Sequence, residues 1–169
     1  MTTPEPWLRG PIPEIVPVLQ PVAHALVLTD ETIRAVTADL SRYDLWRRPG
    51  GAASIGFHLA HLAGSTDRLL TYARDEQLSD NQRAALAREG TADADRPALD
   101  ALLGEWGRVM DDALGQLRDT VETDLVEPRF VGRARLPSTV IGLLFHAAEH
   151  AARHTGQIVT TAKILSADR

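Results

Sequence analysis

Five of the six histidines in this chain fall in two short runs whose spacing suits a metal site. His146, His150 and His154 follow one another at intervals of four residues, and His58 and His61 lie close together in the first half of the chain. Side chains four residues apart share one face of a helix, so two imidazoles one turn apart can bind a single ion. A third imidazole from a neighbouring helix would complete a three-histidine site with open positions for water or substrate.

The residues around the longer run indicate which imidazoles face inward. With about 100° per residue and His146 at zero, His150 lies at about 40° and His154 at about 80° on a helical wheel. Leu143 and Ile158 belong to an apolar stripe over the same sector. His150 and His154 are therefore expected to face the interior, with His146 at the edge. Buried imidazoles need hydrogen-bond partners or a metal.

The pattern around the shorter run does not indicate whether His58 or His61 would bind the metal. Leu59, Leu62 and Leu69 cluster on one side of the helix expected there. His58 lies closer to the centre of that stripe than His61, which shares its side with polar residues, so spacing alone leaves both open. An interpretation without metal also stays open, in which the imidazoles are hydrogen-bonded core residues.

The composition argues against several classes of protein. The chain has no cysteine, so any metal must be held by nitrogen and oxygen atoms. The formal net charge is −5 and no basic block occurs, which argues against a nucleic-acid partner. No apolar run approaches the roughly 18 residues of a membrane span, and the N-terminus lacks the pattern of a secretory signal. We expect a soluble, cytoplasmic protein that acts on a small molecule.

The hydrophobic pattern predicts a single domain over residues 1–169 that is almost entirely helical. Four prolines are expected to keep residues 1–13 extended. No segment alternates with the period of strands, and the four long helices indicate an all-α fold, a four-helix bundle. Helices are expected at about 22–40, 54–74, 79–89, 97–117 and 138–164, with a loop at 90–96 and an irregular stretch at 119–137 that holds a short extended piece.

Three stretches match one known family in order and separation. They are LWRRP at 45–49 followed by SIGFHLAHLAGSTDRLL at 54–70, then LPSTVIGLLFHAAEH at 136–150, and EHAARHTGQI at 149–158. Through them, nearly the whole chain beyond its proline-rich start resembles the DinB-like family of bacterial four-helix-bundle metalloproteins. The resemblance implies a long crossover between the second and third bundle helices, here residues 75–96, and a homodimer.

The resemblance also implies a set of ligands. The family's S-I-G-x₄-H motif falls on residues 54–61, and its H-x₃-H-x-G-Q motif falls on residues 150–157. His61, His150 and His154 are therefore the implied metal ligands, and His61 is favoured over His58. Residues expected behind the ligands, in the pocket or in contact with substrate are His58, His146, Gln157, Asp67, Arg68 and Tyr72.

Three neutral imidazoles favour Zn²⁺ or Ni²⁺, with Fe²⁺ and Mn²⁺ also open. Such an ion lowers the pKa of bound water or of a bound thiol, which produces a nucleophile at neutral pH. Relatives of the family include S-transferases that use low-molecular-weight thiols. The leading expectation is therefore a metal-dependent enzyme that transfers a small thiol to an electrophile. A metal-dependent hydrolase and a non-catalytic metal-binding stress-response protein are the alternatives.

Overall fold

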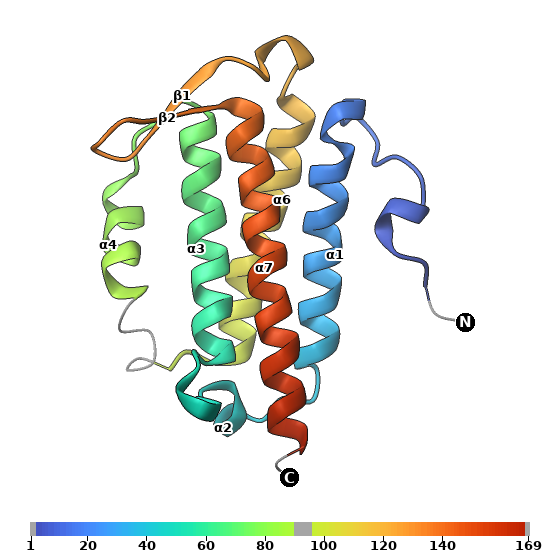
Figure 1. Cartoon of the computed structure of the whole chain (residues 1–169), viewed down its shortest axis with the longest axis vertical. Coiled ribbons are helices and arrows are strands. Elements are labelled where there is room, and N and C mark those ends of the chain that lie inside the picture. The colour runs from blue at the N-terminus through green and yellow to red at the C-terminus, as the bar shows by residue number, and fades with distance from the viewer. Residues whose placement is uncertain (1–2, 90–95, 168–169) are drawn as a thin grey trace.

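The computed structural model describes residues 3–89 and 96–167, and four long helices form its body. These helices are α1 (Gln20–Thr37), α3 (Ile55–Ala73), α6 (Leu99–Asp119) and α7 (Val140–Ala167). They run side by side along the long axis of the molecule (Figure 1). α7 packs on α3 and α1, and α6 packs on the same two helices from the other side. The prediction of an all-α four-helix bundle is confirmed.

Aliphatic side chains fill most of the core, as an aromatic content of only 5% requires. On α6, Leu102, Trp106 and Val109 are buried at intervals of three and four residues, which places them on one face. α7 buries a second stripe that includes Leu144 and Ile158. These stripes fix the rotation of each helix about its axis and therefore decide which side chains meet where α3 and α7 lie together.

The helix starts predicted at about residues 54 and 79 are confirmed, and a serine caps each of them. The Ser54 hydroxyl accepts a hydrogen bond from the backbone N–H of Phe57 at 3.1 Å and caps α3. Ser79 and Gln82 exchange side-chain-to-backbone bonds at the start of α4 (Asp80–Glu89), which is the capping-box arrangement. Both caps set the position of helices that carry residues of the candidate site.

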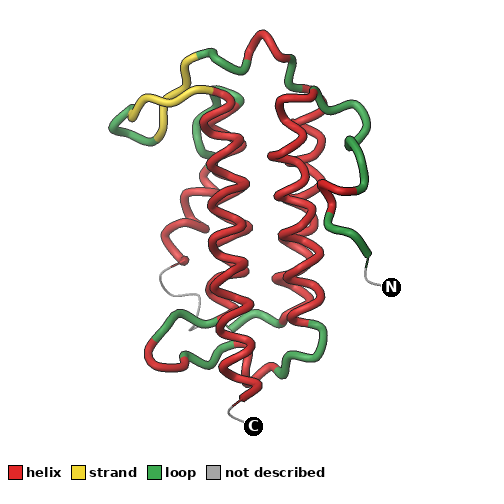
Figure 2. Tube along the Cα trace, turned by 45° about the vertical axis from the view of Figure 1, so that its right-hand side comes forward, coloured by secondary structure: helices red, strands yellow, loops and turns green. Residues whose placement is uncertain are grey.

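Two other helix starts were predicted too early. The last helix begins at Val140 because the residues before it form strand β2 (Leu136–Thr139), which pairs antiparallel with β1 (Pro128–Val131). α6 begins at Leu99, since Pro97 precedes the helix instead of opening it. The short extended piece expected within 119–137 thus lies in the hairpin that β1 and β2 form, visible in yellow in Figure 2.

Short elements connect the long helices at the ends of the bundle. α2 (Arg42–Leu45) is followed by Trp46, whose ring packs so closely against Gly56 that a β-carbon there would lie 2.7 Å from it. The proline-rich start was predicted to be extended, but it contains the 3₁₀ turn η1 and is therefore not extended throughout. The 3₁₀ turns are η1 (Pro6–Leu8), η2 (Pro17–Leu19), η3 (Pro49–Gly51) and η4 (Glu122–Asp124).

The connection from α3 to α6 contains α4, which lies alongside α3 on the outside of the bundle (Figures 1 and 2). This path agrees with the long crossover predicted over 75–96, although most of its expected loop, residues 90–95, lies outside the described residues. No residue of α4 is buried, so polar contacts rather than core packing attach it to α3.

Within the described ranges, no helix is both long enough and apolar enough to cross a membrane.

Candidate metal centre

The packing of α3 against α7 brings together three imidazoles from residues far apart in the chain. His61 lies on α3, and His150 and His154 lie one turn apart on α7. One ring nitrogen from each lies within 4.8 Å of the other two. His61 Nε2 and His150 Nε2 are 3.1 Å apart. The wheel preference for His58 is not followed, and the grouping is the one that the family resemblance implied.

The donor set fits a divalent cation. Two nitrogens bound to one ion at about 2.0–2.1 Å lie roughly 2.9–3.4 Å apart for bond angles between octahedral and tetrahedral. The separation of 3.1 Å between the Nε2 atoms of His61 and His150 falls in this range. His150 Nδ1 is buried without a hydrogen-bond partner among the described residues. His150 is therefore not a fully hydrogen-bonded core imidazole, and the interpretation without metal fits it poorly.

A carboxylate from α4 orients the imidazole of His61. Glu89 Oε2 lies 2.9 Å from His61 Nδ1, and Arg68 donates a hydrogen bond to Glu89 Oε1. The Glu89 side chain is only 14% exposed. With Nδ1–H donated to the carboxylate, His61 presents the lone pair of Nε2 toward His150. Metal-binding histidines usually have this outer carboxylate partner.

Sequence reasoning missed Glu89. The residue was expected only as the last residue of a helix in the crossover, and it is 28 positions from His61 along the chain. No spacing rule links the two residues, because their contact depends on how α4 lies on α3. The one signal available was the general need of a metal-binding histidine for an outer carboxylate.

The electrostatics favour neutral imidazoles with lone pairs available to a cation. Burial, aided by the neighbouring histidines, lowers the pKa of His154 to about 4. Burial also lowers the pKa of His150, and the nearby His61 adds to the effect. For Glu89, burial acts to raise the pKa, but the hydrogen bonds from His61 and Arg68 outweigh it and leave the pKa below its usual value. Glu89 is therefore ionised at neutral pH.

His58 and His146 flank the three grouped imidazoles on opposite sides. His58 is 5% exposed, and its Nδ1 lies 3.0 Å from Nδ1 of His154, so one ring donates and the other accepts. Burial lowers the pKa of His58. The His146 side chain is 50% exposed and lies 3.3 Å from Glu149. His58 thus contacts a candidate ligand directly, whereas His146 lies at the rim.

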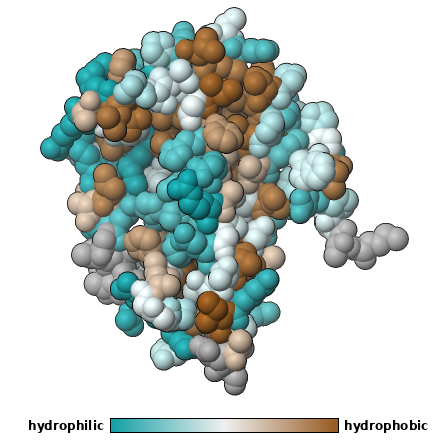
Figure 3. Space-filling view, in the orientation of Figure 1, coloured by the Kyte–Doolittle hydropathy of each residue, from teal (hydrophilic) through white to brown (hydrophobic). Residues whose placement is uncertain are grey.

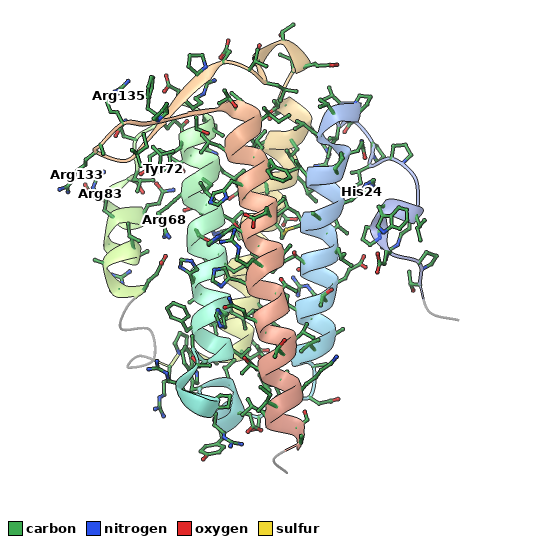
Figure 4. The ribbon with its side chains drawn as sticks, in the orientation of Figure 1. His24, Arg68, Tyr72, Arg83, Arg133 and Arg135 are labelled. Carbon is green, nitrogen blue, oxygen red and sulfur yellow. The ribbon has the colours of Figure 1, made fainter. Side chains whose placement is uncertain are left out.

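The remaining residues predicted to line the pocket or contact substrate do not touch the grouped histidines directly. Asp67 accepts a hydrogen bond from Gln82 of α4 at 2.8 Å, and no contact links it to the grouped histidines. Arg68 reaches the site through Glu89. Figure 4 shows Arg68 and Tyr72 on the side of α3 that faces α4 and the hairpin. Gln157 is exposed on α7, one turn beyond His154.

The fold and this cluster define the class of protein: a four-helix bundle in which the second and last long helices bring three histidines together at their contact. A family model of the DinB superfamily matches residues 25–158, a range that includes all three histidines. The chain belongs to the DinB superfamily. None of the curated proteins compared with it matches.

Proposed function

We propose that this protein is a metal-dependent enzyme that binds one divalent cation through His61, His150 and His154. The observation that carries the proposal is the pair of Nε2 atoms 3.1 Å apart, with Nδ1 of His61 held by a carboxylate that is only 14% exposed. An all-imidazole donor set suits Zn²⁺ or Ni²⁺, and Fe²⁺ and Mn²⁺ also accept it.

Transfer of a small thiol to an electrophile is the reaction we propose. Three neutral ligands leave the ion its full charge and open positions, so a bound ion would lower the pKa of a thiol at neutral pH. The thiol would lose its proton to solvent, and its sulfur would form a bond to the electrophilic carbon as the leaving group departs with its electron pair. Glu89 keeps Nδ1 of His61 protonated, and Arg68 balances the charge of that carboxylate. The thiol dependence is inferred from the resemblance to thiol-dependent transferases.

Hydrolysis, the alternative reaction, has less support from the arrangement of carboxylates. A hydrolase needs a base for the attacking water. Glu89 is already bound by His61 and Arg68, and Glu149 is bound by Arg153 and His146. Neither carboxylate is therefore placed to take a proton from water. A non-catalytic metal-binding role shares the ligands and differs only in the absence of turnover.

The test begins with elemental analysis of untagged protein prepared without chelators, beside the double variant His61→Ala/His150→Ala. We expect about one metal per chain in the native protein and none in the variant. Thiol consumption is then measured with glutathione and cysteine against a panel of alkyl and aryl halides. Metal binding with no thiol consumption would leave the non-catalytic role, and absence of metal after addition of all four cations would overturn the metal site itself.

A further inference from the structure

A cavity of about 450 Å³ lies beside the candidate metal centre, between the beginning of α3 and the second half of α7. Its volume is in the range of sites for small molecules. It adjoins the histidine cluster through His58, which lines the cavity and contacts His154. The remaining lining comes from η3 and the residues after it and from α7: Pro49, Ala52, Ala53, Arg153, Gly156, Gln157, Thr160, Thr161 and Ile164.

The polar groups of this cavity are suited to an anion. No carboxylate is among its described lining residues, and Arg153 contributes a cation. Arg153 uses Nε and Nη2 to bind one oxygen of Glu149, which leaves Nη1 without a partner in the described part of the chain. The amide of Gln157 lies one turn further along α7 from Arg153, on the same face. Both side chains can donate hydrogen bonds to one carboxylate.

Thr161 adds a neutral polar group to the lining of the cavity. The residue lines the cavity and is 5% exposed. Its hydroxyl is not among the fully buried side-chain atoms that lack a partner, and a hydroxyl that is open to the cavity can bond to a bound molecule. A hydroxyl or carbonyl group on a bound molecule would be the partner in that bond.

The described lining of this cavity carries no carboxylate, although the protein as a whole is acidic. A cavity of about 470 Å³ beside α2 also lacks carboxylates in its described lining and is lined by Arg42, Arg47 and Arg96. The chain has a net charge of −5. A larger cavity of about 630 Å³ between α3 and α6 is lined by five aspartates and two arginines. An anion would therefore meet less repulsion in the cavity beside the histidines than in the one lined by aspartates.

Gly156 keeps the cavity open. A β-carbon at this position would meet no atom within 4 Å, so the space beside the helix is empty there. Glycine weakens a helix interior relative to alanine. Gly156 thus leaves room in the cavity next to Gln157, which a larger side chain would occupy.

We propose that this cavity binds the electrophilic substrate of the metal-dependent reaction, and that the substrate is a small, elongated acid with one carboxylate and a largely apolar body. The carboxylate pairs with Arg153 and Gln157, and the body lies along α7 toward Thr161 and Ile164, a span of roughly 16 Å between residues 153 and 164. The link to the reaction rests on the proposed function, whereas binding of the acid does not.

The first experiment measures binding of 4-phenylbutyrate to the whole protein by ¹H–¹⁵N NMR titration, with neutral 4-phenylbutyramide as the matched ligand. For a ligand of this size we expect a dissociation constant of about a millimolar for the acid. Amide shifts should centre on residues 153–161. Equal binding of the amide, or no saturable shift at these residues, overturns the proposal.

Variants test the residues that define the cavity. Arg153→Gln should weaken binding of the acid about tenfold or more, because a charge-assisted hydrogen bond is lost. Gly156→Leu should abolish binding, since its side chain fills the cavity, while thermal unfolding reports whether the fold is intact. Lys163→Gln removes the same charge from an exposed position on α7 and should leave binding unchanged. Unchanged binding in the first two variants would contradict the assignment.

A third measurement separates this proposal from the metal site. In protein loaded with Mn²⁺, the bound acid should show enhanced relaxation of its protons, and the His61→Ala/His150→Ala variant should bind the acid without that enhancement. Acid binding in a protein that takes up no metal would remove the proposed function and leave the cavity as a binding site. If the acid binds to the Mn²⁺-loaded protein without enhanced proton relaxation, the cavity is not the substrate site.

Discussion

His61 takes part in both contacts that define the candidate centre, one through each ring nitrogen. Its Nε2 lies against His150, and its Nδ1 lies against Glu89. The sequence was sufficient to predict that His61, His150 and His154 lie together, because an interval of four places two of them on one helix face and a family motif indicates the third. Glu89 could not be found in this way, since its contact depends on the docking of a separate helix.

Replacing Glu89 by Gln should weaken metal binding by about tenfold to a hundredfold, because an outer carboxylate fixes the tautomer and basicity of its histidine. The affinity is measured by competition with a chromophoric chelator. Glu76→Gln is the control, since Glu76 is exposed in the same crossover and contacts Arg74 instead of a histidine. Equal affinity of native and Glu89→Gln proteins would contradict the orienting role of this carboxylate.

Gly64 offers a second way to disturb the same contact without touching a charge. A β-carbon at Gly64 would lie 2.6 Å from Glu89 Oε1 and 2.9 Å from Arg68 Nη1. Because both atoms end flexible side chains, Gly64→Ala should leave the fold intact and displace the carboxylate from His61. We expect a loss of metal affinity similar to that of Glu89→Gln.

Gly104→Ala on α6 is the matched control for that change. Its β-carbon would meet no atom within 4 Å. It should leave metal affinity unchanged and raise the free energy of unfolding by about 0.5–1 kcal/mol through helix propensity alone. Equal metal affinity in the two alanine variants would show that displacement of Glu89 has no effect.

Among the elements, α4 differs from the bundle helices because nothing in it is buried. Gln82 near its start donates to Asp67 at 2.8 Å and to Thr71 at 2.7 Å. Glu89 at its end binds His61 and Arg68. Since one of these attachments includes a candidate metal ligand, metal binding and docking of α4 should stabilise each other.

Removal of metal should therefore increase hydrogen exchange in α4 more than in α6. An ion on Nε2 of His61 favours the tautomer whose Nδ1–H is donated to Glu89, and without the ion that preference is lost. Mass spectrometry of peptic fragments measures the difference. A uniform change across both helices would contradict the coupling, and Gln82→Ala should loosen the start of α4 with or without metal.

Arg9 and Glu31 join the N-terminal segment to α1 through two hydrogen bonds of 2.6 and 2.7 Å. The hydrogen bond from Arg9 lowers the pKa of Glu31 despite some opposing burial. A carboxyl with a lowered pKa stabilises the folded contact above its ordinary titration range and loses that effect as the pH falls through the lowered value. The segment around Trp7 should therefore become more mobile in acid, at pH values below the ordinary titration range of a glutamate.

NMR relaxation of the Trp7 indole N–H measures this mobility at neutral and acidic pH. Glu31→Gln should give the mobile state already at neutral pH and remove the dependence on pH. A native protein in which Trp7 relaxes equally at both pH values would contradict the prediction.

Some elements could not be derived from local pattern. Residues 136–140 contain a proline, a serine and a threonine, a pattern that is typical of the start of a helix. Pro137 instead lies opposite Phe130 in the hairpin, and the helix begins only after the strand. These residues pair with strand β1, which precedes them in the chain, and this pairing outweighs their local preference for a helix start. The sequence pattern of residues 136–140 alone cannot predict such a pairing.

At the scale of the whole molecule, the bundle was predictable because four long amphipathic helices have few ways to bury their apolar faces. The assembly of the bundle with a second copy stays a prediction, and we propose a homodimer. On the face seen in Figure 3, apolar surface gathers over the upper parts of α7 and α1. Phe145 of α7 is 60% exposed. Exposed apolar patches often mark protein contacts.

Sedimentation equilibrium tests the dimer. The native protein should sediment as a dimer at about 100 μM, well above the dissociation constants of stable dimers, and Phe145→Ser should shift it toward monomer. Leu86→Ser removes an exposed apolar side chain from α4 and serves as the control. A monomeric native protein would remove the proposal.

His61 and His150 are 89 residues apart in the chain, and an ion held by both would close a loop that includes α4, α6 and the hairpin. Such an ion would act as a cross-link, because it would join two distant points of the chain. A covalent cross-link over a loop of this length reduces the entropy of the unfolded chain by an amount worth roughly 4–5 kcal/mol. Unlike a disulfide, this cross-link needs no cysteine and no oxidising environment, and it can be inserted or withdrawn by the free concentration of a cation.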